Sequence, residues 1–142
     1  MSDVLEELRV REPLFHRPEL GTTRADFEKM TEESFWEIGA SGRRYDRPYI
    51  LDELDKRYAS SFEDDWQTRD FQCTEIAAGN YLVTYTLIQN RSRVTRRATL
   101  WRRTEEGWKA VYHQGTIVSE PEDSTPRESM TPDGPPPSPA AG

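Results

Sequence analysis

The sequence has few of the residues that build disulfides and metal sites. Cys73 is the only cysteine among 142 residues, so no intramolecular disulfide can form. The two histidines, His16 and His113, lie far apart, and no Cys-x-x-Cys, His-Glu-x-x-His or acidic calcium-loop spacing occurs. A glycine-rich phosphate loop is missing as well. We therefore predict no metal site and no cofactor.

The sequence also lacks a long apolar run and an excess of positive charge. No apolar stretch approaches the ~20 residues that cross a bilayer, and no basic-then-apolar leader opens the chain. The formal net charge is −7, which disfavours general binding to nucleic acid or to an anionic membrane surface. We therefore expect a cytoplasmic protein whose partners include neither nucleic acid nor membrane.

Large aromatic side chains compensate for a hydrophobic fraction of only 34%. The chain has four Trp, six Tyr and five Phe, and each such side chain can fill much of a small core. From residue 119 onward Pro, Ser, Glu and Asp dominate, and these residues bury too little apolar surface to offset the entropy of ordering. We predict one domain over residues 1–118 and a disordered tail over residues 119–142.

Local patterns predict an α+β fold. Apolar spacing and capping residues favour helices that begin near Ser2 or Asp3, at Thr22 or Thr23, and after Asp46. Aromatic, β-branched and alternating segments favour a hairpin over 34–39 and 43–46, and strands over 67–77, 81–90, 94–103 and 108–118. The three helices are expected to pack on one face of a curved, mainly antiparallel sheet.

The other face of the sheet is predicted to meet a second copy of the chain. Strict alternation along the last strand puts Trp108 and Tyr112 on the face opposite His113. Aromatic side chains are favoured in interface cores, so we predict a homodimer through the sheet. The alternative is that these two rings contact the hairpin of their own domain.

Two segments and the order of elements resemble the nuclear transport factor 2-like superfamily, and within it the SnoaL-like small bacterial domains. The segments are Phe35-Trp36-Glu37-Ile38-Gly39-Ala40-Ser41-Gly42-Arg43 and an ending that runs from Leu100-Trp101-Arg102-Arg103 through Gly107-Trp108-Lys109 to His113-Gln114-Gly115-Thr116. The resemblance implies a cone in which three N-terminal helices close over the sheet and leave a pocket. Together with the alternation of side chains along the strands, it predicts ligand contacts from Phe35, Tyr85, Arg97, Thr99, Trp101 and His113.

A similar ending occurs in the association domain of calcium/calmodulin-dependent kinases, a distant relative. By that resemblance, Leu87 and Gly115 stand at positions where cationic residues can occur.

His113 is the sharpest candidate for chemistry, because a histidine titrates near neutral pH and can serve as acid, base or donor. It could instead be a core histidine that fixes the sheet. Glu37 could form an acid–base pair with it. The alternative, which we favour from sequence, is that Glu37 pairs with Arg43 or Arg44 of its own hairpin.

Two classes of function remain open. The first is a small-molecule-binding domain, a homodimer with a pocket for a small hydrophobic or acidic ligand. The second is an isomerase-, dehydratase- or cyclase-like enzyme that uses His113 with Glu37 or Tyr85. Binding without turnover is favoured, because the acid–base dyads of the superfamily are not matched residue for residue. A carboxylate within hydrogen-bond reach of His113, facing an enclosed cavity, would favour the enzyme.

Overall fold

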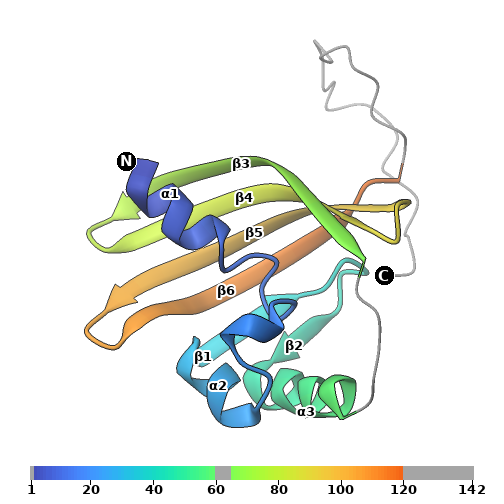
Figure 1. Cartoon of the computed structure of the whole chain (residues 1–142), viewed down its shortest axis with the longest axis horizontal. Helices are drawn as coiled ribbons and strands as arrows, with labels where there is room; N and C mark the ends of the chain where they lie inside the picture. Colours follow the sequence, from blue (N-terminus) through green and yellow to red (C-terminus); the bar gives the residue numbers. More distant parts are fainter. Residues whose placement is uncertain (1, 60–64, 120–142) are drawn as a thin grey trace.

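The computed structural model describes residues 2–59 and 65–119. The elements run in the order α1 (Ser2–Arg9), a 3-10 turn (Pro18–Leu20), α2 (Arg24–Lys29), β1 (Thr31–Ile38), β2 (Arg44–Asp46), α3 (Arg47–Tyr58), β3 (Trp66–Ala77), β4 (Asn80–Gln89), β5 (Arg93–Thr104) and β6 (Gly107–Ile117) (Figure 1). This is the predicted α+β order. From residue 120 onward, the predicted tail lies outside the described residues. None of the helices within the described ranges has the length and apolar character needed to cross a membrane.

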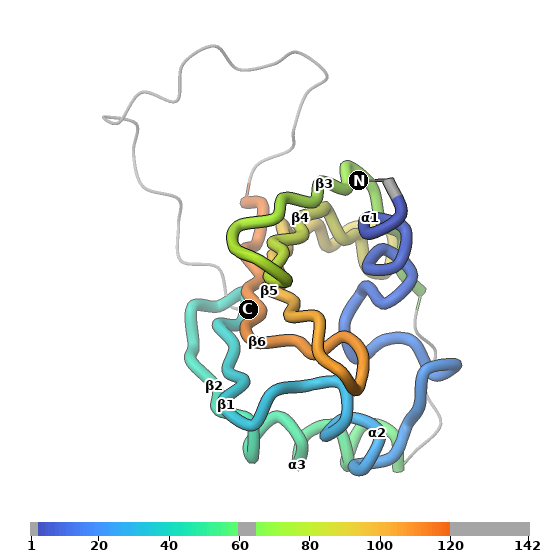
Figure 2. The backbone as a smooth tube through the Cα atoms, turned by 90° about the vertical axis from the view of Figure 1, so that its left-hand side faces the viewer, coloured from blue at the N-terminus to red at the C-terminus, as the bar shows by residue number. Residues whose placement is uncertain are grey.

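The strands form one mixed sheet in the order β2-β1-β6-β5-β4-β3. All neighbours pair antiparallel except β1 and β6, which run parallel. A parallel pair needs a long connection, and here most of the chain lies between the two strands. The pairing therefore sets residues near positions 37 and 113 side by side. In Figure 2 the three helices lie on the same side of the sheet.

The helix starts follow the predicted capping chemistry. The Thr23 side chain accepts a hydrogen bond from the backbone N–H of Asp26, and the Asp26 carboxylate accepts one from the N–H of Thr23 in return. Asp46 caps α3 by accepting a hydrogen bond from the N–H of Tyr49, and Pro48 lies in the first turn, where its missing N–H costs nothing.

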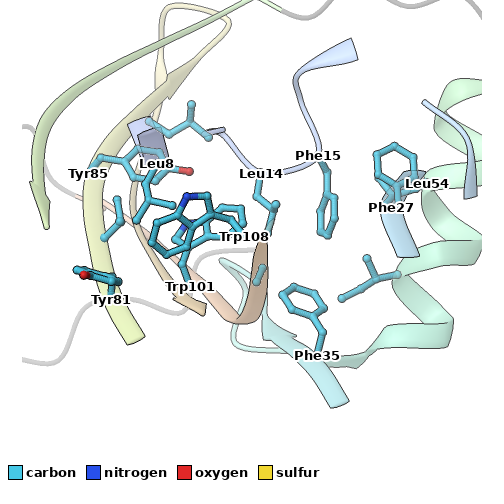
Figure 3. Packing of buried hydrophobic residues seen from close by; sticks show 14 of the residues in the cluster. Leu8, Leu14, Phe15, Phe27, Phe35, Leu54, Tyr81, Tyr85, Trp101 and Trp108 are labelled. Atoms are coloured by element: carbon cyan, nitrogen blue, oxygen red, sulfur yellow. The ribbon is translucent and has the colours of Figure 1, made fainter. Parts of the chain in front are cut away.

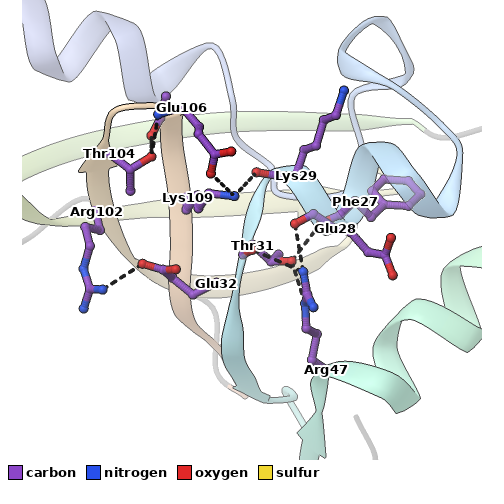
Figure 4. Close-up of polar contacts among 11 residues, drawn as sticks. Phe27, Glu28, Lys29, Thr31, Glu32, Arg47, Arg102, Thr104, Glu106 and Lys109 are labelled. Carbon is purple, nitrogen blue, oxygen red and sulfur yellow. Dashed lines mark hydrogen bonds and ion pairs between the residues drawn. The ribbon is translucent and has the colours of Figure 1, made fainter.

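Strand β1 begins at Thr31, earlier than the Ser34 predicted from sequence, because polar contacts hold this junction in place (Figure 4). The Thr31 hydroxyl donates to the carbonyl of Phe27 over 2.8 Å, and Arg47 Nε donates to Thr31 Oγ1 over 3.1 Å. Arg47 Nη2 also donates to the carbonyl of Glu28 over 2.8 Å. These bonds satisfy the carbonyls at the end of α2 and allow the chain to enter the sheet at once.

The hydrophobic core lies between the helices and the inner face of the sheet (Figure 3). At one end, Leu8 of α1 packs with the Trp101 and Trp108 rings. At the other, Phe15 meets Phe27 and Phe35 edge-on, with ring centroids 5.7 and 5.8 Å apart. Edge-to-face contacts of this kind add to the stabilisation from burial alone.

The predicted position of Trp108 is wrong. A β-bulge interrupts β6 beside Val111: Leu100 pairs with Tyr112, whereas Trp101 pairs with Ala110. The extra residue reverses the alternation on its N-terminal side, so Trp108 points inward together with His113. Trp108 is buried, and its Nε1 donates to Glu7 Oε1 of α1 over 2.9 Å. The alternative of a contact within the domain is therefore correct for this ring: its indole N–H bonds to α1, and its ring lies against Arg103 across the β5–β6 hairpin.

Candidate functional site

The inner face of the sheet is organised in cross-strand rows. One row runs from Val83 through Thr99 to His113, and the parallel β1–β6 pairing extends it to Glu37. The neighbouring rows are Tyr85–Arg97–Gly115 on one side and Tyr81–Trp101–Ala110 on the other. The alternation predicted for β4 and β5 therefore holds, and five of the six predicted ligand-contacting residues lie on this one face.

Glu37 and His113 form a polar pair in which the histidine is buried and the carboxylate is partly buried. His113 Nδ1 lies 3.1 Å from Glu37 Oε1, and only 5% of His113 is exposed. The preferred sequence interpretation, in which Glu37 pairs with Arg43 or Arg44, is therefore wrong. Glu37 bonds to a residue 76 positions away in sequence and not to the arginines of its own hairpin.

The charge environment keeps the Glu37 carboxyl ionised at neutral pH. Burial raises its pKa, but the hydrogen bond from His113 and the positive charges of His113, Arg97 and Arg57 lower the pKa by more. An ionised carboxylate can only accept hydrogen bonds, so His113 Nδ1 carries the proton of this contact. Nε2 is then the ring nitrogen left for another partner.

Thr99 brings an unsatisfied hydroxyl next to the pair. Thr99 pairs with His113 across the β5–β6 ladder and is fully buried. Its Oγ1 has no hydrogen-bond partner among the described residues. A buried polar atom without a partner costs about 1–3 kcal/mol, and native proteins contain few of them. The hydroxyl therefore has unused hydrogen-bonding capacity next to His113.

Arg97 places a guanidinium in the neighbouring row. Its Nε donates to Thr95 Oγ1 over 2.8 Å, and burial lowers the pKa of the side chain. No carboxylate within the described residues lies within 4.0 Å of it. A Cβ on Gly115 would come within 2.9 Å of Arg97 Cζ and Nη1, so glycine is required for the guanidinium to lie over β6. Gly115 stands at a position where relatives can carry a cationic residue, and here Arg97 of β5 places a cation at that position.

Tyr85 and Trp101 direct their polar atoms to a residue that the sequence reasoning missed. The Tyr85 hydroxyl donates to Glu12 Oε1 over 2.7 Å, and Trp101 Nε1 donates to Glu12 Oε2 over 2.9 Å. Glu12 lies between α1 and the 3-10 turn, in a segment without periodicity, so no sequence signal marks it. Phe35, the sixth predicted contact, packs in the core against Phe15.

A hollow of about 200 Å³ opens beside Glu37. It is lined by Phe15, Glu37, Tyr45, Tyr49, Ile50, Glu53, Leu54 and Arg57. Two other hollows, of about 220 and 490 Å³, are bordered by neither Glu37 nor His113. The hollow beside Glu37 is distinguished from the other two by the chemistry of the Glu37–His113 pair and not by its volume. Within the described ranges, no cluster of three or more His, Cys, Asp or Glu side chains could hold a metal ion.

We expect Glu37→Gln to change the pH dependence of stability. Because the pKa of Glu37 in the folded protein lies below its ordinary value of 4.5, the ionised carboxylate stabilises the fold above that pH. The stabilisation is lost as the pH falls through the folded pKa. Urea denaturation at a series of pH values should therefore show a wild-type advantage over Glu37→Gln that is present above pH 4.5 and disappears below it.

Glu53→Gln is the matched control, since Glu53 lines the same hollow but pairs with Lys56 at the surface over 3.1 Å. An advantage over Glu37→Gln that is equal at all pH values, or that grows in acid, would contradict the assigned charge state.

No known protein-family profile matches the chain, and no curated protein matches it in sequence. Solved structures do match. A nuclear transport factor 2-like protein from Cytophaga hutchinsonii aligns with a TM-score of 0.62 and 10% identity, over 82% of this chain and 97% of the other. A candidate calcium/calmodulin-dependent kinase II association domain from Exiguobacterium sibiricum aligns with a TM-score of 0.60 and 20% identity, over 82% and 95%.

A candidate ketosteroid isomerase from Parabacteroides distasonis aligns with a TM-score of 0.55 and 13% identity, over 82% of this chain and 85% of the other. At such identities the likeness concerns the fold and not the activity. The chain has the nuclear transport factor 2-like fold.

Proposed function

We propose that this domain binds a small hydrophobic or acidic molecule in a pocket, closed as a cone by the three helices, whose polar end is the Glu37–His113 pair. The observation that carries the proposal is the contact of His113 Nδ1 with Glu37 Oε1 beside a hollow that Glu37 itself lines. The two side chains come from strands that only the tertiary fold brings together. Buried titratable pairs in hollows are typical of binding and catalytic sites.

The side chains around the pair define the ligand chemistry. Phe15, Ile50 and Leu54 give the hollow an apolar wall. On the inner face, Thr99 Oγ1 and the Arg97 guanidinium add polar groups, the first without a partner and the second without a carboxylate in contact among the described residues. An apolar body with one carboxylate or carbonyl group suits this combination, because a buried cation and a buried hydroxyl both gain by hydrogen bonding to it.

Turnover is the second candidate function, and the Glu37–His113 contact favours it. A carboxylate that holds Nδ1–H fixes the tautomer of the ring and leaves Nε2 as a general base, the arrangement that proton-transfer enzymes use. The candidate ketosteroid isomerase among the structural neighbours has the same fold. The chain would then shift a proton next to a carbonyl of its ligand.

Native mass spectrometry of the purified protein should reveal a small molecule that dissociates on unfolding. We expect Thr99→Val, which is isosteric, to raise the free energy of unfolding of the empty protein by about 1 kcal/mol, because it removes an unsatisfied hydroxyl. The same variant should weaken binding of that molecule about tenfold, the equivalent of one hydrogen bond.

His113→Asn separates the two functions. Asparagine can keep a donor near Glu37 but cannot take up a proton, so binding should persist in part while any chemical change of the ligand stops. Gln114→Ala, on the exposed opposite face, is the control. Full binding by a folded Thr99→Val and His113→Asn double variant would contradict the proposed site.

We also propose that the chain forms a homodimer through the outer face of the sheet. Without Trp108, this face still carries a cross-strand row of apolar side chains, Leu82, Leu100, Tyr112 and Trp36. The helices of the described residues lie on the other side (Figure 2). An apolar stripe left open in this way is typical of an interface.

Leu82→Glu is expected to convert a sedimenting dimer into a monomer, because it places a charge within the apolar stripe at its most open position, where Leu82 is 36% exposed. Val10→Glu, which changes a 43% exposed residue outside the sheet, should leave the dimer intact. Analytical ultracentrifugation at micromolar concentration provides the measurement. A wild-type monomer would remove the dimer proposal.

A further inference from the structure

Glu12 is a buried carboxylate with a complete set of donors. None of its surface is exposed. Oε1 accepts hydrogen bonds from the Tyr85 hydroxyl over 2.7 Å and from the backbone N–H of Leu14 over 2.9 Å. Oε2 accepts one from Trp101 Nε1 over 2.9 Å. Such a group is tolerated inside a protein only when its oxygens are well bonded, and these are.

The core holds two of the donors in place independently of Glu12. The Tyr85 ring stacks on Phe71 with centroids 4.8 Å apart, and Trp101 is fully buried among core side chains. Burial, followed by the charge of Glu12, raises the pKa of Tyr85 well above its ordinary range, so the hydroxyl stays protonated as a donor. The Tyr85 and Trp101 donors are therefore positioned by the core and not by the carboxylate.

The carboxylate itself is carried by a segment outside the regular elements. Helix α1 ends at Arg9, the 3-10 turn begins at Pro18, and we call residues 10–17 between them the strap. Several backbone and side-chain bonds hold the strap, among them those from Arg17 Nε to the Glu12 carbonyl over 2.8 Å and from the Tyr58 hydroxyl to the carbonyl of Phe15 over 2.6 Å. Phe15 has a φ of 73°, a conformation that costs energy in a residue with a side chain.

A hollow borders two of the three residues that supply these donors. The hollow of about 220 Å³ is bordered by Trp101 and by Leu14 of the strap. Arg11, Arg17 and Lys29 line it together with Asp26 and Glu106, so cations outnumber anions along the approach of an anion. The hollow thus reaches both the indole and the segment that supply donors to Glu12.

We propose that Glu12 is an internal ligand: Tyr85 and Trp101, which the core holds in place, form a carboxylate-binding site together with the Leu14 N–H, and a small external monocarboxylate occupies it when the Glu12 side chain alone is withdrawn. The site is separate from Glu37 and His113, which donate nothing to Glu12. Its failure or success therefore leaves the proposed function of that pair untouched.

Chemical rescue of Glu12→Ala tests the proposal. The variant leaves three donors facing a carboxylate-sized space, and its melting temperature should fall by roughly 10 °C or more. Sodium formate should restore a good part of this loss in a saturable way, as ligand binding to the folded state requires. Sodium chloride and neutral formamide at the same concentrations should not. If Glu12→Ala is unfolded in chloride, the same comparison is made by far-ultraviolet circular dichroism, with formate expected to recover the folded spectrum.

Glu7→Ala is the matched control, because Glu7 also accepts from an indole, Trp108 Nε1 over 2.9 Å, but is exposed. Formate should not raise its melting temperature. Adding Tyr85→Phe to Glu12→Ala should weaken the apparent formate affinity about tenfold. Equal effects of formate and formamide, rescue of Glu7→Ala to the same extent, or a formate affinity that ignores Tyr85→Phe would each overturn the proposal.

Discussion

The parallel pairing of β1 with β6 is the constraint on which the site depends. It joins a strand from the first third of the chain to the strand that comes last in the sequence. Its register sets Glu37 opposite His113. Shifting a strand by one residue would turn each side chain to the other face, so this register decides whether the carboxylate meets the imidazole or solvent. Helix α3, whose N-terminal cap is Asp46, follows β2 directly and closes the adjoining hollow through Ile50 and Leu54.

A buried carboxylate, Glu12, and a partly buried one, Glu37, lie in the same domain, and the fold compensates the desolvation of each differently. Glu12 is surrounded by neutral donors from β4, β5 and the strap, which fill its lone pairs. Glu37 has one hydrogen bond to His113 and depends in addition on the positive charges of Arg97 and Arg57. Glu12, whose oxygens are fully hydrogen-bonded, is structural until it is displaced. The Glu37–His113 pair lies next to the Thr99 hydroxyl, which has no hydrogen-bond partner among the described residues, and remains able to act on a ligand.

Local sequence patterns predict the parts of the fold that local physics determines. Thr23 and Asp46 mark helix starts because their side chains bond to backbone groups three residues away, and alternation on β4 and β5 follows from strand geometry. The bulge beside Val111 has no such signature, since it goes with the packing of Trp108 under α1. A prediction from strict alternation therefore puts that ring on the wrong face. The Glu37–His113 and Glu12–Trp101 contacts span 76 and 89 positions, so only the assembled sheet reveals them.

The site depends on β1 placing the ionised carboxylate of Glu37 beside Nδ1 of His113. Long-range ¹H–¹⁵N correlation spectra of the two histidines test this most directly, with His16→Gln used to assign the signals. We expect that neutral His113 carries its proton on Nδ1 and that Glu37→Gln shifts this nitrogen resonance while Glu53→Gln does not. A proton on Nε2 in the neutral ring, with an Nδ1 signal insensitive to Glu37→Gln, would contradict it.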